Sequence, residues 1–406
     1  MTQFELHAPL DRVTEGVLEF DGQRYLNGRA SDPRELGWMR GAPPPPEKRI
    51  TFESSNVWAF PELRWSLSHI RELRTTVKVW RGQGGPSQFE HCDKSSDIDA
   101  LTFVDADGRP RRFDEALFDT YADGFLVLHR GRIVYERYFG ALEPHLPHSC
   151  QSITKSYAGT LTAALVHEGV LDDSKTISHY LPELRGTGWE DATLRQVMDM
   201  QTGLAFTEDY TKVDESFRCD YLRTIPKQGA HGEFSYKSVN TNVMAWVMSR
   251  VTGRSFAELL QERLWAPLGC EEDAYVDIDP TTGMPRAHCG LNVTLRDLAR
   301  FGEMMRCEGA WNGKQLVPAS VVHDLHVGDH PAKPLLRFGY TYRSQWWVSH
   351  NELDSLEASG LYGQVLYISP KAEMVIAMFA SHPASSAHID RVRAPQMLAL
   401  GRMLRA

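Results

Sequence analysis

The spacing of apolar residues changes character along the chain. Around residue 125 and again beyond residue 340, short β-prone runs lie beside turn residues, whereas the stretch between them repeats apolar residues every three or four positions. The first pattern is typical of strands and the second of amphipathic helices. This order predicts an α+β fold, in which an antiparallel sheet built from both chain ends is flanked by helices and carries an inserted, mainly helical region.

Two pairs of apolar runs predict β-hairpins. Segments 125–129 and 133–139 flank a glycine-containing turn, and segments 364–369 and 373–381 flank a proline-containing one. A short connection of this composition between two β-prone runs is a typical hairpin signal. Residues 341–349, which include two adjacent tryptophans, predict one further strand.

Other segments predict helices and irregular structure. Residues 156–169, 242–252 and 255–264 place apolar side chains at helical spacing, and the first of them ends at a glycine. Residues 1–50 are rich in Gly, Pro, Asp and Arg and end near four consecutive prolines, which predict an irregular arm. Residues 82–98 predict a loop.

These elements predict three divisions of the 406-residue chain, which is too long for one small core. An irregular N-terminal arm comprises residues 1–50. An α/β sheet domain combines residues 51–160 with residues 300–406, and a mainly helical domain comprises residues 161–299. We expect the active site at the interface of the last two.

Composition narrows the class of protein and of partner. With 42% hydrophobic and 24% charged residues, the chain is typical of a soluble globular enzyme. Its net charge of −9 and its dispersed basic residues argue against nucleic acid or a membrane as partner. The oligomeric state stays open, with a homodimer as one candidate.

The N-terminus and the cysteines indicate the compartment. The first residues, MTQFELHAPLDR, lack the basic start and apolar run of a secretory signal, and no stretch approaches the ~18 apolar residues of a membrane span. The six cysteines are scattered without metal-like spacing, which predicts buried free thiols rather than disulfides or a metal site. We therefore expect a cytoplasmic protein.

The tetrapeptide Ser152-Ile153-Thr154-Lys155 at the start of the first strong helix is a candidate nucleophile site. Residues three apart share a helix face, so the Lys155 amine can reach the Ser152 hydroxyl. Burial would lower the lysine pKa and allow it to act as a base. The pattern alone is weak, because a chain of this length contains roughly one such tetrapeptide by chance.

Tyr236, at a loop-to-helix junction, is the second candidate. Its hydroxyl could lie between Ser152 and Lys155 and relay a proton to a leaving group, although a tyrosine beside a helix cap is the simpler explanation of that position alone. The sequence contains no G-x-S-x-G, H-E-x-x-H, Walker-A or G-x-G-x-x-G motif, so rival catalytic signatures are missing.

Ser152, Lys155 and Tyr236 in this order resemble the β-lactamase/penicillin-binding-protein superfamily. Within it the chain resembles the 6-aminohexanoate-dimer hydrolase (nylon-oligomer hydrolase) family. The similarity runs from about residue 110 to the end and includes QSITKSYAGTLTAALVHEGVLDD, LRQVMDMQTGLAFTEDY and GEFSYKSVNTNVMAWVMSRVTG. The resemblance implies a β-lactamase-like fold and an amidase or esterase that needs no metal or organic cofactor.

The resemblance also implies roles for individual residues. Ser152 corresponds to the family nucleophile, Lys155 to its proton acceptor, and Tyr236 to the second base and acid. The oxyanion hole would combine the backbone N–H of Ser152 with that of Leu361, and Gly363-Gln364 is the alternative to Leu361.

Substrate-binding positions follow from the same resemblance. Tyr210 corresponds to a tyrosine that hydrogen-bonds the substrate amide, and His288 to a polar wall residue. Asp220 is the candidate partner of a substrate amine, with Asp214 and Glu215 as competitors. The remaining two candidates occupy the second and third motifs of the superfamily: Ser238 and Gly360.

The chain departs from the penicillin-recognising pattern at these two motifs. Where that pattern has Tyr-x-Asn and Lys-Thr-Gly, this sequence has Tyr236-Lys237-Ser238 and Ala358-Ser359-Gly360. The missing lysine removes a charge-assisted contact to a substrate carboxylate, worth about 1.5–3 kcal/mol, although Lys237 offers another cation.

We therefore expect a small-molecule amide or ester substrate, cleaved through an acyl-enzyme. The alternative is a carboxylesterase for short-acyl esters. A D-Ala peptidase or β-lactamase and a catalytically silent binding module are weaker alternatives.

Overall fold

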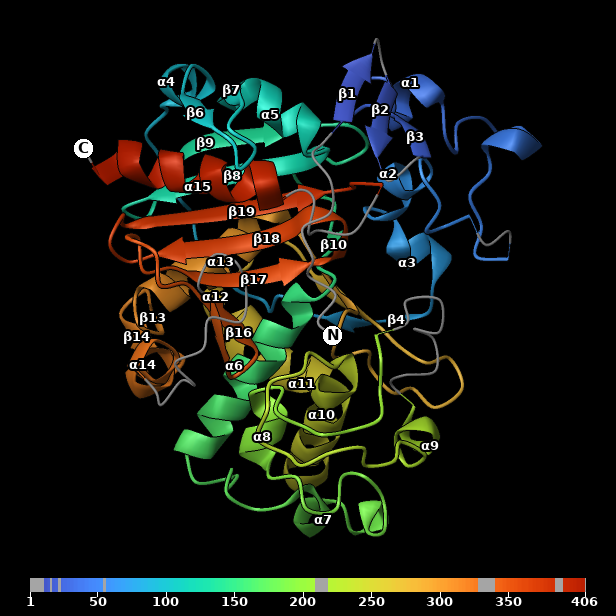
Figure 1. Ribbon diagram of the computed structural model, residues 1–406, viewed down its shortest axis with the longest axis vertical. Coiled ribbons are helices and arrows are strands. Elements are labelled where there is room, and N and C mark those ends of the chain that lie inside the picture. The colour runs from blue at the N-terminus through green and yellow to red at the C-terminus, as the bar shows by residue number, and fades with distance from the viewer. Residues whose placement is uncertain are drawn as a thin grey trace.

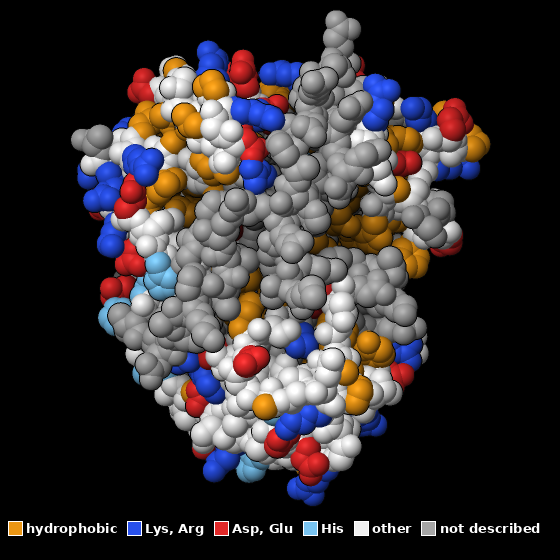
Figure 2. Space-filling model, in the orientation of Figure 1, with side chains coloured by type: hydrophobic (Ala, Val, Ile, Leu, Met, Phe, Trp, Pro, Cys, Tyr) orange, Lys and Arg blue, Asp and Glu red, His pale blue; other side chains and the backbone are white. Residues whose placement is uncertain are grey.

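The computed structural model describes residues 11–14, 17–20, 23–53, 56–208, 218–327, 340–383 and 390–405. In these parts of the chain no helix is long and apolar enough to cross a membrane. Figure 1 shows a large sheet in the upper half of the molecule and a mainly helical lower half. Figure 2 shows acidic and basic side chains interspersed over the described part of one face.

The main sheet has eight strands from two distant parts of the chain. Both predicted hairpins are confirmed, as β8 with β9 and as β18 with β19, and β19 pairs with β8 to join them. All neighbouring strands are antiparallel except the last pair. In spatial order the strands are β15 (Thr341–Arg343), β16 (Trp346–Val348), β17 (Leu356–Gly360), β18 (Gln364–Ser369), β19 (Met374–Ala380), β8 (Ala122–His129), β9 (Arg132–Tyr138) and β5 (Glu90–His91).

Helices cover both faces of this sheet. On one face α13 (Leu295–Arg306) packs on β8, β18 and β19, and on the other α5 (Phe113–Asp119) and α15 (Asp390–Arg405) pack on β8 and β19 (Figure 1). The strands between these layers are fully buried, as expected for a sheet covered on both faces. The chain therefore adopts the α+β architecture predicted from its sequence.

A second, four-stranded sheet lies beside the first. Its order is β10 (His148–Ser149), β12 (Leu291–Val293), β11 (Ala274–Asp277) and β4 (Thr76–Val79). The short ribbons β6 (Thr102–Val104) with β7 (Pro110–Arg112) and β13 (Ala310–Trp311) with β14 (Lys314–Gln315) complete the strands that follow the N-terminal region.

The helical half is built around two long helices. These are α6 (Ile153–His167) and α10 (Ser238–Thr252), where helices were predicted at 156–169 and 242–252. Shorter segments surround them: α7 (Ile177–Tyr180), η2 (Pro182–Leu184), α8 (Leu194–Met198), α9 (Cys219–Leu222), α11 (Phe256–Leu260), η3 (Gln261–Trp265) and α12 (Ala266–Leu268).

The remaining helical segments lie in the N-terminal region and beside the main sheet. They are α1 (Pro33–Leu36), η1 (Pro46–Lys48), α2 (Leu63–Ser66), α3 (Ile70–Leu73), α4 (Ser95–Asp99), α14 (Ala319–Val327) and η4 (Leu361–Gly363).

Three local predictions differ from the structure. Residues 1–50, expected to be irregular, contain a three-stranded sheet of β1 (Asp11–Thr14), β2 (Val17–Phe20) and β3 (Gln23–Leu26). The predicted loop 82–98 contains β5, which pairs in parallel with β9, as well as α4. These elements are short and depend on their neighbours, so they leave little periodicity in the sequence.

The segment 341–349 forms two strands, not one. β15 and β16 pair across a tight turn in which Ser344 and Gln345 both have positive φ, 47° and 67°. This conformation usually requires Gly, Asn or Asp, so a serine followed by a glutamine does not predict a turn. Contacts from the helical half compensate, because Asp199 accepts the Ser344 N–H at 2.8 Å and the carbonyl of Met198 accepts the Gln345 N–H at 3.1 Å.

Helix α6 links the two halves of the molecule. Its side chains are buried continuously from Ile153 to Leu165, so the helix is covered on all sides, as a central helix must be. Close contact with the β15–β16 turn requires Gly159, where a Cβ atom would lie only 2.2 Å from the carbonyl oxygen of Ser344. Helix α6 thus has one fixed position, with its N-terminus beneath the main sheet (Figure 1).

Candidate active site

The start of α6 meets the end of β17. Gly360, the last residue of that strand, packs so closely that a Cβ there would lie 2.7 Å from the Cys150 carbonyl oxygen and 3.0 Å from the Gln151 Cβ. Strand β17 therefore lies against the two residues that precede Ser152. Gln151 itself adopts φ of 48°, an uncommon conformation for a non-glycine residue and one that is often found at functional sites.

Ser152 and Lys155 are joined directly by a hydrogen bond. The Nζ of Lys155 donates to Ser152 Oγ at 2.8 Å and to the backbone carbonyl of His288 at 2.9 Å. Lys155 is 1% exposed, and burial lowers its pKa to about 8. A substantial fraction of this lysine is therefore a neutral amine near physiological pH, as a general base requires.

Tyr236 lies close to both Ser152 and Lys155. Its ring stacks on Trp347 at 5.9 Å and meets Tyr342 edge-on at 6.0 Å, while its hydroxyl is within hydrogen-bonding reach of Ser152. The Lys155 Nζ lies 5.1 Å from the centre of the same ring. Burial raises the pKa of Tyr236 well above its usual value, so the phenol keeps its proton at neutral pH.

The two backbone N–H groups predicted to form an oxyanion hole belong to neighbouring segments. Ser152 precedes the first helical residue of α6, and Leu361 follows Gly360 at the end of β17. Neither N–H has a hydrogen-bond acceptor among the described residues. The close packing at Gly360 brings both segments together, so the geometry is compatible with the oxyanion hole predicted from the sequence.

Ser238 is engaged within the protein. Its backbone N–H and its hydroxyl both donate to the carboxylate of Glu208, the hydroxyl at 3.1 Å. Glu208 also acts electrostatically on Lys155 and Tyr236. Glu208 was not predicted from the sequence, although it lies two positions before Tyr210 in the motif FTEDY. An acidic residue inside a family motif was the available signal, but its contact with a helix 30 positions later depends on the fold.

His288 contributes its backbone more than its side chain. The imidazole is 3% exposed, with Nδ1 3.1 Å from Asn242 Oδ1 and Nε2 3.1 Å from Cys289 Sγ. Burial lowers its pKa well below the usual value, so the ring is neutral. Its carbonyl oxygen holds Lys155, and its predicted role as a polar wall toward substrate stays a prediction.

The candidate amine-binding residues are not gathered at the nucleophile in the described chain. Asp220 lies on α9 with its side chain 65% exposed and forms an ion pair with Arg218 at 2.7 Å. Tyr210, Asp214 and Glu215 lie outside the described residues.

Lys237, the alternative cation for a substrate carboxylate, points inward. It is 6% exposed, and its Nζ donates to the Thr202 carbonyl at 2.9 Å. Its ammonium is therefore held inside the protein by a backbone carbonyl. This removes the compensation that Lys237 could have offered for the missing lysine of the third motif.

A buried ionic cluster supports the strand that leads to Ser152. His148 of β10 lies 3.3 Å from one oxygen of Asp123, and Arg64 donates to the other at 3.2 Å. Arg64 also donates to Ser31 and Ser381, at 2.8 and 3.1 Å, so it ties the N-terminal region to the main sheet. Such a fully partnered cluster holds its members in fixed positions.

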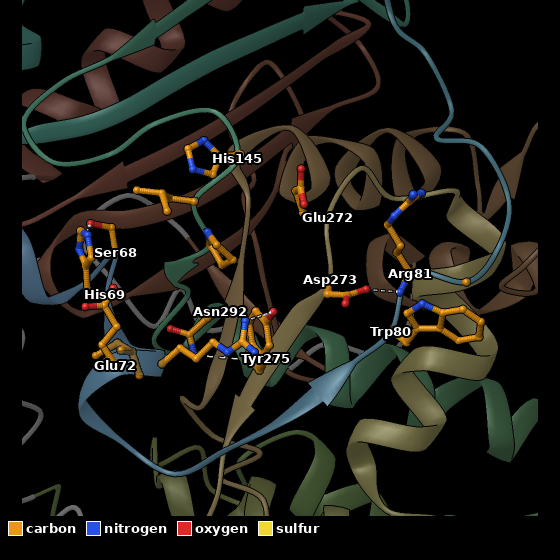
Figure 3. Close-up of a pocket in the computed structure, with 15 residues that line it drawn as sticks. Ser68, His69, Glu72, Trp80, Arg81, His145, Glu272, Asp273, Tyr275 and Asn292 are labelled. Atoms are coloured by element: carbon orange, nitrogen blue, oxygen red, sulfur yellow. Dashed lines mark hydrogen bonds between the residues drawn. The ribbon is translucent and has the colours of Figure 1, made fainter.

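A separate cavity of about 660 Å³ contains none of these residues. Figure 3 shows Trp80 and Arg81 on one side of it and His69 on the other, above Tyr275 of β11. One of its charged groups, the guanidinium of Arg71, lies 4.1 Å from the centre of the Tyr275 ring. In the described residues no three His, Cys, Asp or Glu side chains gather closely enough to hold a metal ion.

Comparison with known proteins assigns the class. The chain matches the family model described as Beta-lactamase over residues 115–397, so the protein belongs to the β-lactamase family and is a serine hydrolase by that membership. It is 31% identical over 350 residues to the 6-aminohexanoate-dimer hydrolase of Paenarthrobacter ureafaciens, covering 80% of this chain and 86% of that protein.

Solved structures agree with this assignment. One from Bacillus anthracis, to which 6-aminohexanoate-dimer hydrolase activity is attributed, has a TM-score of 0.79 and 32% identity over 86% of this chain and 96% of its own. A family VIII carboxylesterase shares the fold at 16% identity, with a TM-score of 0.57 over 69% of this chain and 91% of its own.

Proposed function

We propose that this protein cleaves an amide or ester bond through an acyl-enzyme on Ser152. The observation that carries the proposal is the 2.8 Å hydrogen bond between Ser152 Oγ and the buried Lys155, whose pKa of about 8 supplies a neutral amine. A serine hydroxyl is a weak nucleophile, and an adjacent base of matched pKa is what activates it.

Acylation begins with transfer of the Ser152 proton to the neutral Lys155 amine as Oγ attacks the substrate carbonyl. The oxyanion that forms is stabilised by the N–H groups of Ser152 and Leu361. As the tetrahedral intermediate collapses, the carbonyl–nitrogen or carbonyl–oxygen bond breaks. Tyr236 then protonates the leaving amine or alcohol and receives the Lys155 proton in return.

Deacylation uses the same groups in reverse. A water molecule loses a proton toward Lys155 and Tyr236 while its oxygen attacks the ester carbonyl, and the Ser152 oxygen regains a proton as it leaves. The raised pKa of Tyr236 favours a role as proton donor and relay over a role as a standing base. No step requires a metal or an organic cofactor.

The substrate that this proposal favours is a linear amide of the 6-aminohexanoate-oligomer type, with esterase activity at the same site. Similarity to 6-aminohexanoate-dimer hydrolases over most of the chain supports it. The inward-facing Lys237 and the absent Lys-Thr-Gly motif argue against substrates that need a carboxylate contact, such as β-lactams or D-Ala peptides.

A carboxylesterase for short-acyl esters is the second candidate. The specific observation in its favour is the ion pair between Asp220 and Arg218, which occupies the carboxylate expected to meet a substrate amine. Paired rates on an amide and an ester with the same acyl chain, with and without a terminal amine, distinguish the two.

A cytoplasmic location is supported by the six cysteines, all of which are free.

The decisive test is replacement of the nucleophile. S152A should abolish turnover of a p-nitrophenyl acyl ester while retaining the circular dichroism spectrum and melting temperature of the parent protein. Mass spectrometry after reaction with a fluorophosphonate should show one adduct, on Ser152, in the parent protein only. Retained turnover in S152A would refute the assignment.

A further inference from the structure

Glu208 joins two parts of the catalytic machinery. Its carboxylate accepts the backbone N–H and the hydroxyl of Ser238, the first residue of α10. The residue before α10, Lys237, makes no side-chain cap, so Glu208 supplies from another segment the acceptor that a helix N-terminus needs. Tyr236 lies two residues before Ser238, so this contact also fixes the backbone that carries Tyr236.

The same carboxylate acts on the base. Glu208 is the acidic side chain that raises the pKa of Lys155 against the opposite effect of burial. The other titratable groups near Lys155 are neutral or face elsewhere: burial raises the pKa of the Cys289 thiol and lowers that of the His288 ring. Of the nearby charges, Lys237 is bound to Thr202.

We propose that Glu208 is a positioning residue with two separable effects: it anchors the start of α10, and it stabilises the ammonium that Lys155 becomes during acylation. This inference rests on the proposed function. It extends that function by assigning a fourth side chain to the Ser152, Lys155 and Tyr236 set.

The physical reason is the change of charge during the reaction. When Lys155 takes the Ser152 proton it becomes an ammonium inside a nearly dry site, where an isolated cation is costly. A carboxylate fixed beforehand, by two hydrogen bonds from a helix start, compensates that charge without reorganising. The same carboxylate keeps part of the Lys155 population protonated in the resting enzyme. The rise of kcat/KM with pH, its acidic limb, therefore lies at higher pH than it would without Glu208.

Two substitutions separate the two effects. E208Q keeps an oxygen acceptor for the Ser238 N–H and removes the charge. We expect the acidic limb of kcat/KM for a neutral p-nitrophenyl ester to move down by roughly one pH unit. E208D keeps the charge but is one methylene shorter. We expect its limb to stay in place while kcat falls roughly tenfold, because Tyr236 is less well held.

E233Q is the matched control. Glu233 is an exposed carboxylate in the same connection, three residues before Tyr236, and no hydrogen bond to the catalytic residues involves it. Its replacement should leave both the acidic limb and kcat at the parent values. This result would show that losing a negative charge near the site is not sufficient to shift the limb.

If the acidic limb of the kcat/KM profile is unchanged in folded E208Q, the electrostatic effect is refuted. If kcat is unchanged in E208D, the anchoring effect is refuted. If E208Q does not fold, E208D still decides, because a displaced limb in that variant contradicts the proposal. The role of Glu208 and the proposed function can fail independently. If only the role of Glu208 is wrong, S152A is still inactive but the acidic limb of E208Q does not move.

Discussion

At the scale of single residues, the chemistry depends on how little of Lys155 is exposed. An amine on the surface keeps a pKa near ~10.4 and is protonated at neutral pH. In this protein burial lowers the pKa to about 8, and the carboxylate of Glu208 limits that decrease. The His288 carbonyl and Ser152 Oγ are its two hydrogen-bond acceptors, so the amine is satisfied without a permanent ion pair in direct contact.

The pH dependence of hydrolysis follows from this residue. In the proposed mechanism the neutral amine is the active form, and its population rises as the pH rises through about 8. We therefore expect kcat/KM for an uncharged ester to increase with pH and level off above an apparent pKa near that value, because kcat/KM reports the free enzyme. A profile that is flat between pH 6 and 9 would contradict a role for Lys155 as the base. Buffer-only hydrolysis at each pH is the control.

At the scale of elements, the site exists where three of them converge. Helix α6 presents Ser152 and Lys155 at its start, β17 ends beside them, and Tyr236 lies two residues before α10. Each contact is close-packed: α6 touches the β15–β16 turn at Gly159, and β17 touches the segment before Ser152 at Gly360. In such an arrangement, a displacement of one element by an ångström moves a reacting atom.

Gly360 tests this convergence. In G360A the new methyl group would lie 2.7 Å from the Cys150 carbonyl, so β17 or the segment before Ser152 must shift. We expect kcat/KM to fall by at least ~10-fold, since the Leu361 N–H moves with the strand end. Steady-state ester hydrolysis measures this effect. G84A, at a glycine with open space around it, should be indistinguishable from the parent protein. Parent-like activity of G360A would show that β17 does not help to form the site.

At the scale of the whole molecule, the sheet and the helical half share one interior. The largest hydrophobic cluster includes Leu126 of β8, Phe379 of β19 and Trp246 of α10. Polar contacts cross the same boundary: Asp199, just after α8, accepts from Arg343 and from the Ser344 N–H, both at 2.8 Å. The predicted division at residues 160 and 300 therefore crosses a continuous core.

A shared core predicts cooperative unfolding. We expect a single calorimetric transition whose van't Hoff and calorimetric enthalpies agree, although the chain has 406 residues. D199A removes a 3%-exposed carboxylate from a set of arginine contacts and should shift this transition to lower temperature without splitting it, at a cost of about 3 kcal/mol. Two resolved transitions in the parent protein would show that the halves unfold independently and would support the predicted domains.

The sequence by itself determined the class of fold and predicted Ser152 as the nucleophile. Strand hairpins near residue 130 and residue 370 follow from local apolar runs and turn composition, which need no distant partner. Ser152 and Lys155 are three apart on one helix, so their contact is local, and the pattern of segments around them identified the family. The single strand predicted at 341–349 merged two elements, because the left-handed turn at Ser344 and Gln345 is stabilised from α8 and not by its own residue types.

Only the tertiary structure decided the rest of the site. Glu208 meets Ser238 across 30 residues, Gly360 meets Cys150 across more than 200, and Lys237 turns inward to Thr202. These contacts follow from the packing of elements distant in sequence, for which residue type and spacing carry no signal. The pKa of Lys155 is decided in the same way, because burial and the charge of Glu208 exist only once the halves of the molecule have assembled around α6.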